Sequence, residues 1–194
     1  MTKGVTKMAD WLLPDYIFQS FTDVTPEFLD SVGIKALLID IDNTLAPYEV
    51  AEPDDRIKNW FCELKKNGIR ATLVSNNDRE RVELFNRELS LNAYYKSGKP
   101  FAKNLKKAMA EMSSDKTNTA MMGDQLLTDA AAGKHIGLTT IIVPPIKDKS
   151  NAFFRAKRAL EVPTIKKYVR LHADDQAIAE KCCFWLEKMY KKGR

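Results

Sequence analysis

The pattern that most constrains the fold is an alternation of short apolar runs with amphipathic segments between residues 36 and 143. The apolar runs have the length of buried strands and lie at residues 36–40, 70–77, 93–100, 117–125 and 138–145. The segments between them carry apolar residues at helical spacing and lie at residues 53–68, 78–89, 101–112 and 128–137. Strands that alternate with helices through short connections predict a parallel sheet covered on both faces. We therefore expect a three-layer α/β/α, Rossmann-like fold with about five parallel strands.

The 194 residues are enough for one domain with a hydrophobic core and too few for two domains of ordinary size. We divide it into a core at about 34–146, an N-terminal arm at 1–33 and a tail at 147–194. In the arm, Thr25 as a cap and Pro26 at the first helical position predict a short helix. The tail contains extra helical segments, and the last of them has an apolar face that suits packing on the core or on a second copy of the chain.

Composition excludes several classes of protein. Hydrophobic residues make up 44% and charged residues 29%, as in an ordinary soluble domain. The three cysteines form no CxxC pair and no disulfide framework, and two histidines leave almost no ligands for zinc. The first residues lack the apolar segment of a signal peptide, and no run is long enough to span a bilayer. We expect a cytoplasmic protein.

The net charge of +5 is concentrated in the tail. Residues 147–194 hold 13 Lys and Arg against 6 Asp and Glu, whereas residues 1–146 hold 18 against 20. A solvated helix face is the commoner cause of such a surplus, and an anionic membrane surface would suit it as a partner of a peripheral protein. Aromatic residues alternate with these basic ones, as in RNA-binding segments, but no nucleic-acid motif accompanies them, so we expect no nucleic-acid partner.

Polar side chains collect where the predicted strands end. They are Asp40, Asp42, Asn43 and Thr44 after the first strand, Ser75, Asn76 and Asn77 after the second, Lys99 after the third, and Asp124 after the fourth, with Asp129 one helical turn further on. In an open parallel sheet, ligands bind at the carboxyl ends of the strands. These residues therefore predict one site.

This set of residues favours phosphoryl-transfer chemistry. Converging carboxylates repel one another unless a cation neutralises them, and an oxygen-only ligand set favours Mg²⁺. Ser75, Lys99 and backbone N–H groups at strand-to-helix turns could cradle a phosphoryl group. Asp40 could attack phosphorus and form an aspartyl-phosphate. Asp42, two residues on in an extended strand, would point the same way and could protonate the leaving group and then activate water.

In order and spacing, these motifs resemble those of the haloacid dehalogenase (HAD) superfamily of phosphatases. "DIDNT" at 40–44 resembles its first motif, Ser75 of "LVSNN" its second, Lys99 of "GKP" its third and "GDQLLTD" at 123–129 its fourth. The resemblance spans about residues 11–145 and is closest to the YqeG-like group of subfamily IIIA. Relatives of that group include phosphatidylglycerophosphate phosphatases.

The resemblance implies a role for each residue. Asp40 would be the nucleophile and a Mg²⁺ ligand, and Asp42 would be the general acid and base and would ligate the metal through its backbone carbonyl. Ser75 would hydrogen-bond the phosphoryl group and Lys99 would balance its charge. The remaining residues would ligate the metal (Asp124), hold the metal shell or orient the lysine (Asp129), or support the substrate (Asn43, Thr44 and Asn76). Lys96 could also reach inward, although the Lys-Pro context favours Lys99.

Members of this superfamily often carry a mobile cap, and this chain has no room for one. Asp42 and Ser75 lie 33 positions apart, and Ser75 and Lys99 lie 24 apart, which leaves space for one helix and one strand each. An uncapped site takes a large substrate or borrows a cover from a neighbouring subunit. A phospholipid head group such as that of phosphatidylglycerophosphate would suit the first option. Residues 45–49 are the nearest thing to a lid.

Two other classes remain for comparison. A receiver domain also phosphorylates an aspartate, but the acceptor there ends the third strand, where this chain has no acid. A non-catalytic or regulatory protein that binds a lipid, RNA or protein partner could retain the same site. The enzyme is favoured, because the motif residues Asp40, Asp42, Lys99 and Asp124 are all present.

Overall fold

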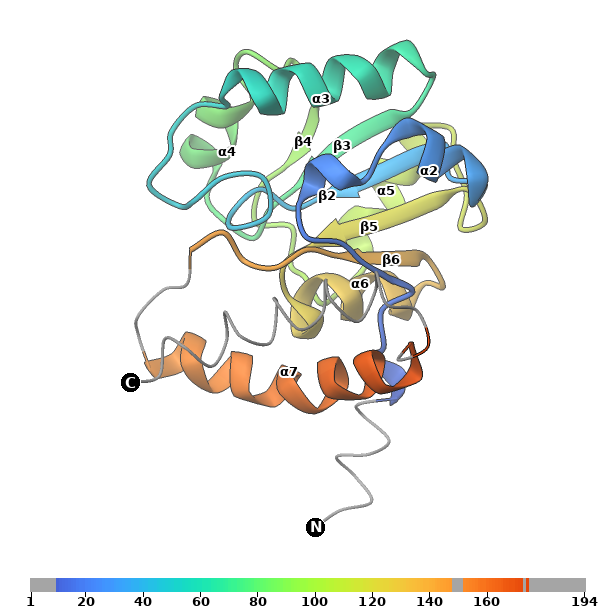
Figure 1. The fold of residues 1–194 in the computed structure, drawn as a ribbon. Coiled ribbons are helices and arrows are strands. Elements are labelled where there is room, and N and C mark those ends of the chain that lie inside the picture. The colour runs from blue at the N-terminus through green and yellow to red at the C-terminus, as the bar shows by residue number, and fades with distance from the viewer. Residues whose placement is uncertain (1–9, 148–151, 173, 175–194) are drawn as a thin grey trace.

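One parallel sheet organises the part of the chain that the computed structural model describes, residues 10–147, 152–172 and 174. Six strands lie in the order β1-β6-β5-β2-β3-β4, as Figure 1 shows. Their bounds are β1 Tyr16–Ile17, β2 Ala36–Ile39, β3 Arg70–Val74, β4 Asn92–Tyr94, β5 Thr119–Gly123 and β6 Thr139–Ile142. Because β5, β2, β3 and β4 are adjacent in that order, the four strand ends that carry the predicted site are neighbours.

Helices cover both faces of this sheet. Leu37 and Ile39 of β2 pack in a cluster with α2 (Pro26–Ser31), α3 (Asp55–Lys66) and α4 (Arg79–Asn86). Ala36 and Leu38 point to the opposite face and pack with α5 (Lys103–Glu111) and α6 (Ala131–His135). All four of these strand residues are fully buried, as strict alternation in a doubly covered strand requires. The expected three-layer α/β/α architecture is confirmed.

Short polar side chains start three of the helices. Thr25 accepts the N–H of Phe28 at the start of α2, as the sequence predicts. Asp54 and Asp78 accept the N–H groups of the residues three positions later at the starts of α3 and α4. Each cap satisfies one N–H that the first helical turn leaves unpaired. The caps of α3 and α4 therefore fix where the chain leaves the loops that follow β2 and β3.

The N-terminal arm differs from the expectation, because it adds a sixth strand. The arm pairs with the sheet through β1, which lies parallel to β6, and it continues into the short 3₁₀ turn η1 (Phe21–Asp23) and then into α2. Asp15 fixes this edge: its Oδ2 accepts hydrogen bonds from the N–H and the hydroxyl of Thr140, each at 2.8 Å, and from Lys134 Nζ at 2.8 Å. A two-residue strand held by polar contacts has too little pattern for sequence reasoning to detect.

The tail packs on the core through α7 (Ala152–Leu171), a single helix that runs through Pro163 where the sequence suggests two segments. Ile165 and Tyr168 are buried against Ile17 of β1 and against η2 (Leu126–Ala130), a π-helical turn that precedes α6. The predicted last helix, residues 174–192, lies outside the described part except for Asp174. Within the described ranges, no helix is both long and apolar enough to cross a membrane.

Candidate active site

A cavity of about 260 Å³ opens where β2, β3 and β5 end. Six of the nine residues to which the resemblance assigns a role line it: Asp40, Asp42, Ser75, Asn76, Lys99 and Asp129. The other lining residues are Tyr48, Asn77, Gln125, Thr128 and Lys157. The two acids of "DIDNT" thus face the same cavity, as expected from alternation along an extended strand.

The loop after β2 is held by its own polar residues. Asp40 N–H donates to Met122 O at 2.9 Å and extends the pairing with β5 by one step. Asn43 adopts a left-handed φ of 65° and donates its N–H to Ala46 O at 2.7 Å. Its side-chain oxygen accepts the N–H of Lys147, and Thr44 Oγ1 lies 3.5 Å from Asp40 Oδ2. Asn43 and Thr44 are buried outside the cavity lining, so they support the loop.

Lys99, not Lys96, reaches the acids. Its Nζ lies 2.7 Å from Asp40 Oδ1 and 2.7 Å from Asp129 Oδ1, and its side chain is 2% exposed. Lys96 is exposed. The position of Lys99 is set by Asn76, whose Oδ1 accepts the N–H of Lys99 and whose Nδ2 donates to the carbonyl of Lys99, both at 2.9 Å. In this arrangement Asn76 holds the lysine loop while it lines the cavity.

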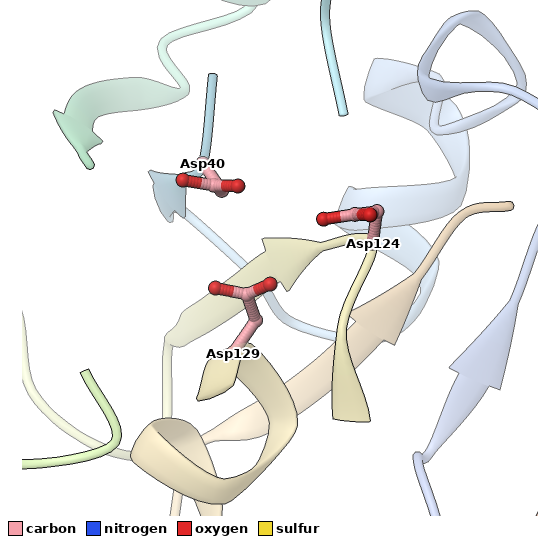
Figure 2. A group of neighbouring side chains, drawn as sticks. All are labelled: Asp40, Asp124 and Asp129. Carbon is pink, nitrogen blue, oxygen red and sulfur yellow. The ribbon is translucent and has the colours of Figure 1, made fainter. Parts of the chain in front are cut away.

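Three buried carboxylates converge beside that lysine. Figure 2 shows Asp40 after β2, Asp124 after β5 and Asp129 in η2 pointing toward one another. Each offers an oxygen, and these oxygens lie within 4.8 Å of one another. Three negative charges against the single positive charge of Lys99 leave a deficit that a divalent cation would neutralise, and oxygen ligands suit Mg²⁺. The donor set therefore fits that ion.

Burial and charge set the protonation of these groups. Burial raises the pKa of Asp40 to about 8; Lys99 opposes this rise, while Asp129 and Asp124 add to it. Burial would lower the pKa of Lys99, but the carboxylates of Asp129 and Asp40 outweigh it and raise that pKa above its ordinary value. Lys99 consequently stays cationic, and the charged form of Asp40 is costly until a further positive charge arrives.

A glycine makes room for the third carboxylate. A Cβ at Gly123, the last residue of β5, would lie 2.3 Å from Asp129 Cγ, which is far inside van der Waals contact. Asp129 Oδ2 accepts the N–H of Gln125 at 3.1 Å, so the side chain folds back over the start of η2. The glycine of "GD" is therefore a steric requirement of the site.

Asp42 is held by residues to which sequence analysis assigned no role. Its Oδ2 accepts from Asn77 Nδ2 at 3.0 Å and lies 3.5 Å from Ser75 Oγ. Its Oδ1 accepts from Arg81 Nε at 3.1 Å. The signal for Arg81 is local: Asp78 caps α4, so Arg81 falls in a first helical turn that begins at the end of β3.

The tail also reaches the cavity. Lys157 of α7 donates from Nζ to Gln125 Oε1 at 2.8 Å, and both residues line the cavity. The N–H of Leu127 donates to the buried Glu161, which ties α7 to η2. Tyr48, from the segment proposed as a lid, also lines the cavity, and a Lys147–Glu49 ion pair joins that segment to the chain after β6.

A protein family and a named relative both match this chain. Residues 96–150 match a family described as HAD-hydrolase-like. A Bacillus subtilis (strain 168) protein named "Probable phosphatase YqeG" is 36% identical over 151 residues, which cover 78% of this chain and 88% of that protein.

Phosphatases are among the solved structures to which the chain is similar. The cobalt-bound deoxy-D-mannose-octulosonate 8-phosphate phosphatase of Haemophilus influenzae is 15% identical, with a TM-score of 0.47, over 71% of this chain and 92% of that one. The 3-deoxy-D-manno-octulosonate 8-phosphate phosphatase of Moraxella catarrhalis, in complex with magnesium, phosphate and KDO, is 15% identical, with a TM-score of 0.45, over 77% of this chain and 98% of that one.

Proposed function

Because the chain belongs to the HAD superfamily of phosphatases, in its YqeG-like group of subfamily IIIA, it is a phosphoric monoester hydrolase, and we propose that it works through an aspartyl-phosphate on Asp40 with Mg²⁺. The observation that carries the proposal is the buried arrangement of Lys99 between Asp40 and Asp129, beside Asp124. A nucleophilic carboxylate needs a fixed orientation and neutralised surroundings. Lys99 supplies the fixed orientation and one positive charge, and Mg²⁺ would supply the rest.

In the first half of the reaction, an oxygen of Asp40 attacks phosphorus and the bond from phosphorus to the leaving alcohol breaks. The alcohol oxygen takes a proton from the carboxyl group of Asp42, which lines the same cavity. Ser75 donates its hydroxyl to the phosphoryl group. Lys99 holds Asp40 by one oxygen, Oδ1, and offsets negative charge as the new bond forms.

In the second half, a water oxygen attacks phosphorus and transfers its proton to the carboxylate of Asp42. The bond between phosphorus and Asp40 breaks, inorganic phosphate leaves, and Asp42 is again protonated for the next cycle. Asp42 therefore needs a fixed orientation toward both the leaving oxygen and the water.

Asp40, Asp124 and Asp129 would hold the Mg²⁺, with the backbone carbonyl of Asp42 as a further ligand. When bound, the ion supplies positive charge that stabilises the transferring phosphoryl group. Binding of Mg²⁺ to these ligands can be measured without an activity assay. Mg²⁺ at 100 times its dissociation constant should stabilise the fold by about 2.7 kcal/mol, and Asp124→Asn should remove that stabilisation in thermal unfolding.

For the substrate we propose phosphatidylglycerophosphate, hydrolysed by a cytoplasmic protein that associates peripherally with the membrane. The absence of room for a cap between the motifs supports a large substrate whose own bulk closes the site. A cavity of about 260 Å³ is smaller than most small-molecule sites, so the bulk of a lipid substrate would lie outside it. The discriminating screen compares phosphatidylglycerophosphate in mixed micelles with soluble sugar and nucleotide phosphates; faster hydrolysis of a soluble ester would overturn this choice.

The enzyme assignment has its own test in the hydrolysis of para-nitrophenyl phosphate. We expect turnover with Mg²⁺, none with EDTA, and none in Asp40→Asn. Asp55→Asn is the matched control, because its side chain is 95% exposed on α3. Near-normal turnover in Asp40→Asn would remove Asp40 as nucleophile, and inert wild-type protein across a broad panel of phosphate esters would favour a non-catalytic binding role.

A further inference from the structure

Arg81 is held tightly against Asp42, which acts in both halves of the proposed reaction. Its Nε donates to Asp42 Oδ1 at 3.1 Å, and its Nη2 lies 3.1 Å from the same oxygen. The two side chains are only 12% and 6% exposed. An ion pair so shielded from water is stronger and better defined than a surface pair.

Two further contacts fix the arginine itself. Its Nη1 donates to the carbonyl of Ala51 at 3.3 Å, and its guanidinium carbon lies 5.0 Å from the ring centroid of Phe85, which is buried. A planar guanidinium held at three places presents its donors in one direction. Arg81 is thus a rigid support and not a mobile surface cation.

The carboxylate of Asp42 is engaged at both oxygens. Arg81 takes Oδ1, and Asn77 Nδ2 donates to Oδ2 at 3.0 Å. Asn77 and Ser75 both reach Oδ2, so without Arg81 the carboxylate could swing about that oxygen. With Oδ1 also engaged, the carboxylate is held in one orientation at the cavity that Asp42 lines.

We propose that Arg81 is a positioning residue that holds Asp42 in the orientation from which it accepts the proton of the attacking water. The inference rests on the proposed function. Held at both oxygens, the carboxylate of Asp42 presents one orientation to the water that attacks the aspartyl-phosphate as phosphate leaves from Asp40. The loss of Arg81 should therefore impair hydrolysis of the intermediate most.

The leaving group separates the two halves of the reaction. Para-nitrophenolate departs without needing a proton, so formation of the aspartyl-phosphate from para-nitrophenyl phosphate depends little on Asp42. Hydrolysis of the intermediate still needs a base. In Arg81→Gln we expect a rapid release of about one para-nitrophenol per site, followed by turnover lowered about 10- to 100-fold, a part of what general acid–base catalysis contributes. KM should fall together with kcat because the intermediate accumulates.

The experiment is rapid-quench kinetics with para-nitrophenyl phosphate and Mg²⁺ on the full chain. Arg81→Lys should recover part of the turnover, because lysine keeps the positive charge but lacks the planar set of N–H donors of the guanidinium. Arg79→Gln is the matched control: Arg79 lies on the same helix, is 67% exposed and pairs with Glu83 away from the cavity. Thermal unfolding and binding of beryllium fluoride show whether each variant keeps its fold and its phosphoryl site; if Arg81→Gln does not fold, Arg81→Lys carries the comparison.

Two outcomes overturn the inference while leaving the proposed function intact. One is wild-type kcat in the folded Arg81 variants. The other is a raised KM at unchanged kcat, which would make Arg81 a substrate-binding residue. Wild-type protein that is inert toward every phosphate ester, in contrast, overturns the proposed function and this inference with it.

Discussion

Replacing the nucleophile should stabilise the metal-free protein while it abolishes turnover. Burial raises the pKa of Asp40 from 3.8 to about 8 in the folded chain, against the opposing effect of Lys99. An acid whose folded pKa lies above its unfolded pKa binds more protons when folded, so the free energy of unfolding falls as the pH rises from about 4 to about 8. Asn at position 40 carries no charge and removes this loss.

The size of the effect follows from the same pKa. At about 1.4 kcal/mol per pKa unit, the loss in wild-type protein approaches about 5 kcal/mol at pH 8, and most of it develops above pH 5. Asn buries an N–H₂ group where Asp40 has an oxygen, and a donor left without an acceptor there takes back about 1–3 kcal/mol. Asp129 still pairs with Lys99. We expect Asp40→Asn to be more stable than wild type by about 2–4 kcal/mol at pH 8.

Urea denaturation in EDTA at pH 5 and pH 8 measures the difference. Wild-type protein should lose stability between the two pH values relative to Asp40→Asn, and the gap should narrow at pH 5. Asp55→Asn, at an exposed acid, should follow wild type at both values. The reasoning is refuted if wild type and Asp40→Asn change in parallel between pH 5 and pH 8, or if Asp40→Asn is the less stable of the two at pH 8.

Three further substitutions probe separate parts of the structure. Gly123→Ala should lower kcat at least about 10-fold, because the new Cβ displaces Asp129 and with it the partner of the site lysine, and this can be read in para-nitrophenyl phosphate assays. Asp15→Asn should lower the free energy of unfolding by about 1 kcal/mol in urea titrations and leave kcat unchanged, since it loses the ion pair with Lys134 far from the cavity. Lys157→Ala should raise KM and leave kcat within about twofold, because that side chain lines the cavity and donates to Gln125; a fall in kcat alone would contradict this.

The site residues that sequence analysis located best are those at strand ends. Asp40, Ser75 and Asp124 follow buried apolar runs, and in a parallel sheet such positions meet at one edge whatever the side chains around them do. The choice between Lys96 and Lys99 could not be settled in this way, since both follow the same strand. It depends on Asn76, 23 positions earlier than Lys99, which brackets the backbone of that lysine.

Residues that do not directly follow a strand could be placed only from the folded structure. Arg81 reaches Asp42 from a helix that is four residues away from the strand end, and the sequence shows that helix as amphipathic without showing which partner its first turn meets. The edge strand β1 depends on Asp15 and Thr140, which lie 125 positions apart. Contacts at such separations leave no periodic trace in a single sequence.

The spacing of the motifs could not predict that the C-terminal tail contributes to the site. The intervals between the motifs exclude an inserted cap, and the basic surplus of residues 147–194 suggests a surface feature separate from the chemistry. The apolar contacts of Ile165 and Tyr168 instead lay α7 along η2, and the Glu161–Leu127 hydrogen bond fixes its position there. Because η2 also carries Asp129, the helix that contributes Lys157 to the cavity and the turn that supplies a metal-site carboxylate form one packed unit. A substrate that pushed α7 aside would therefore disturb Asp129 and the lysine it holds, so we expect the substrate to enter beside α7, past Tyr48 and Lys157, and not beneath it.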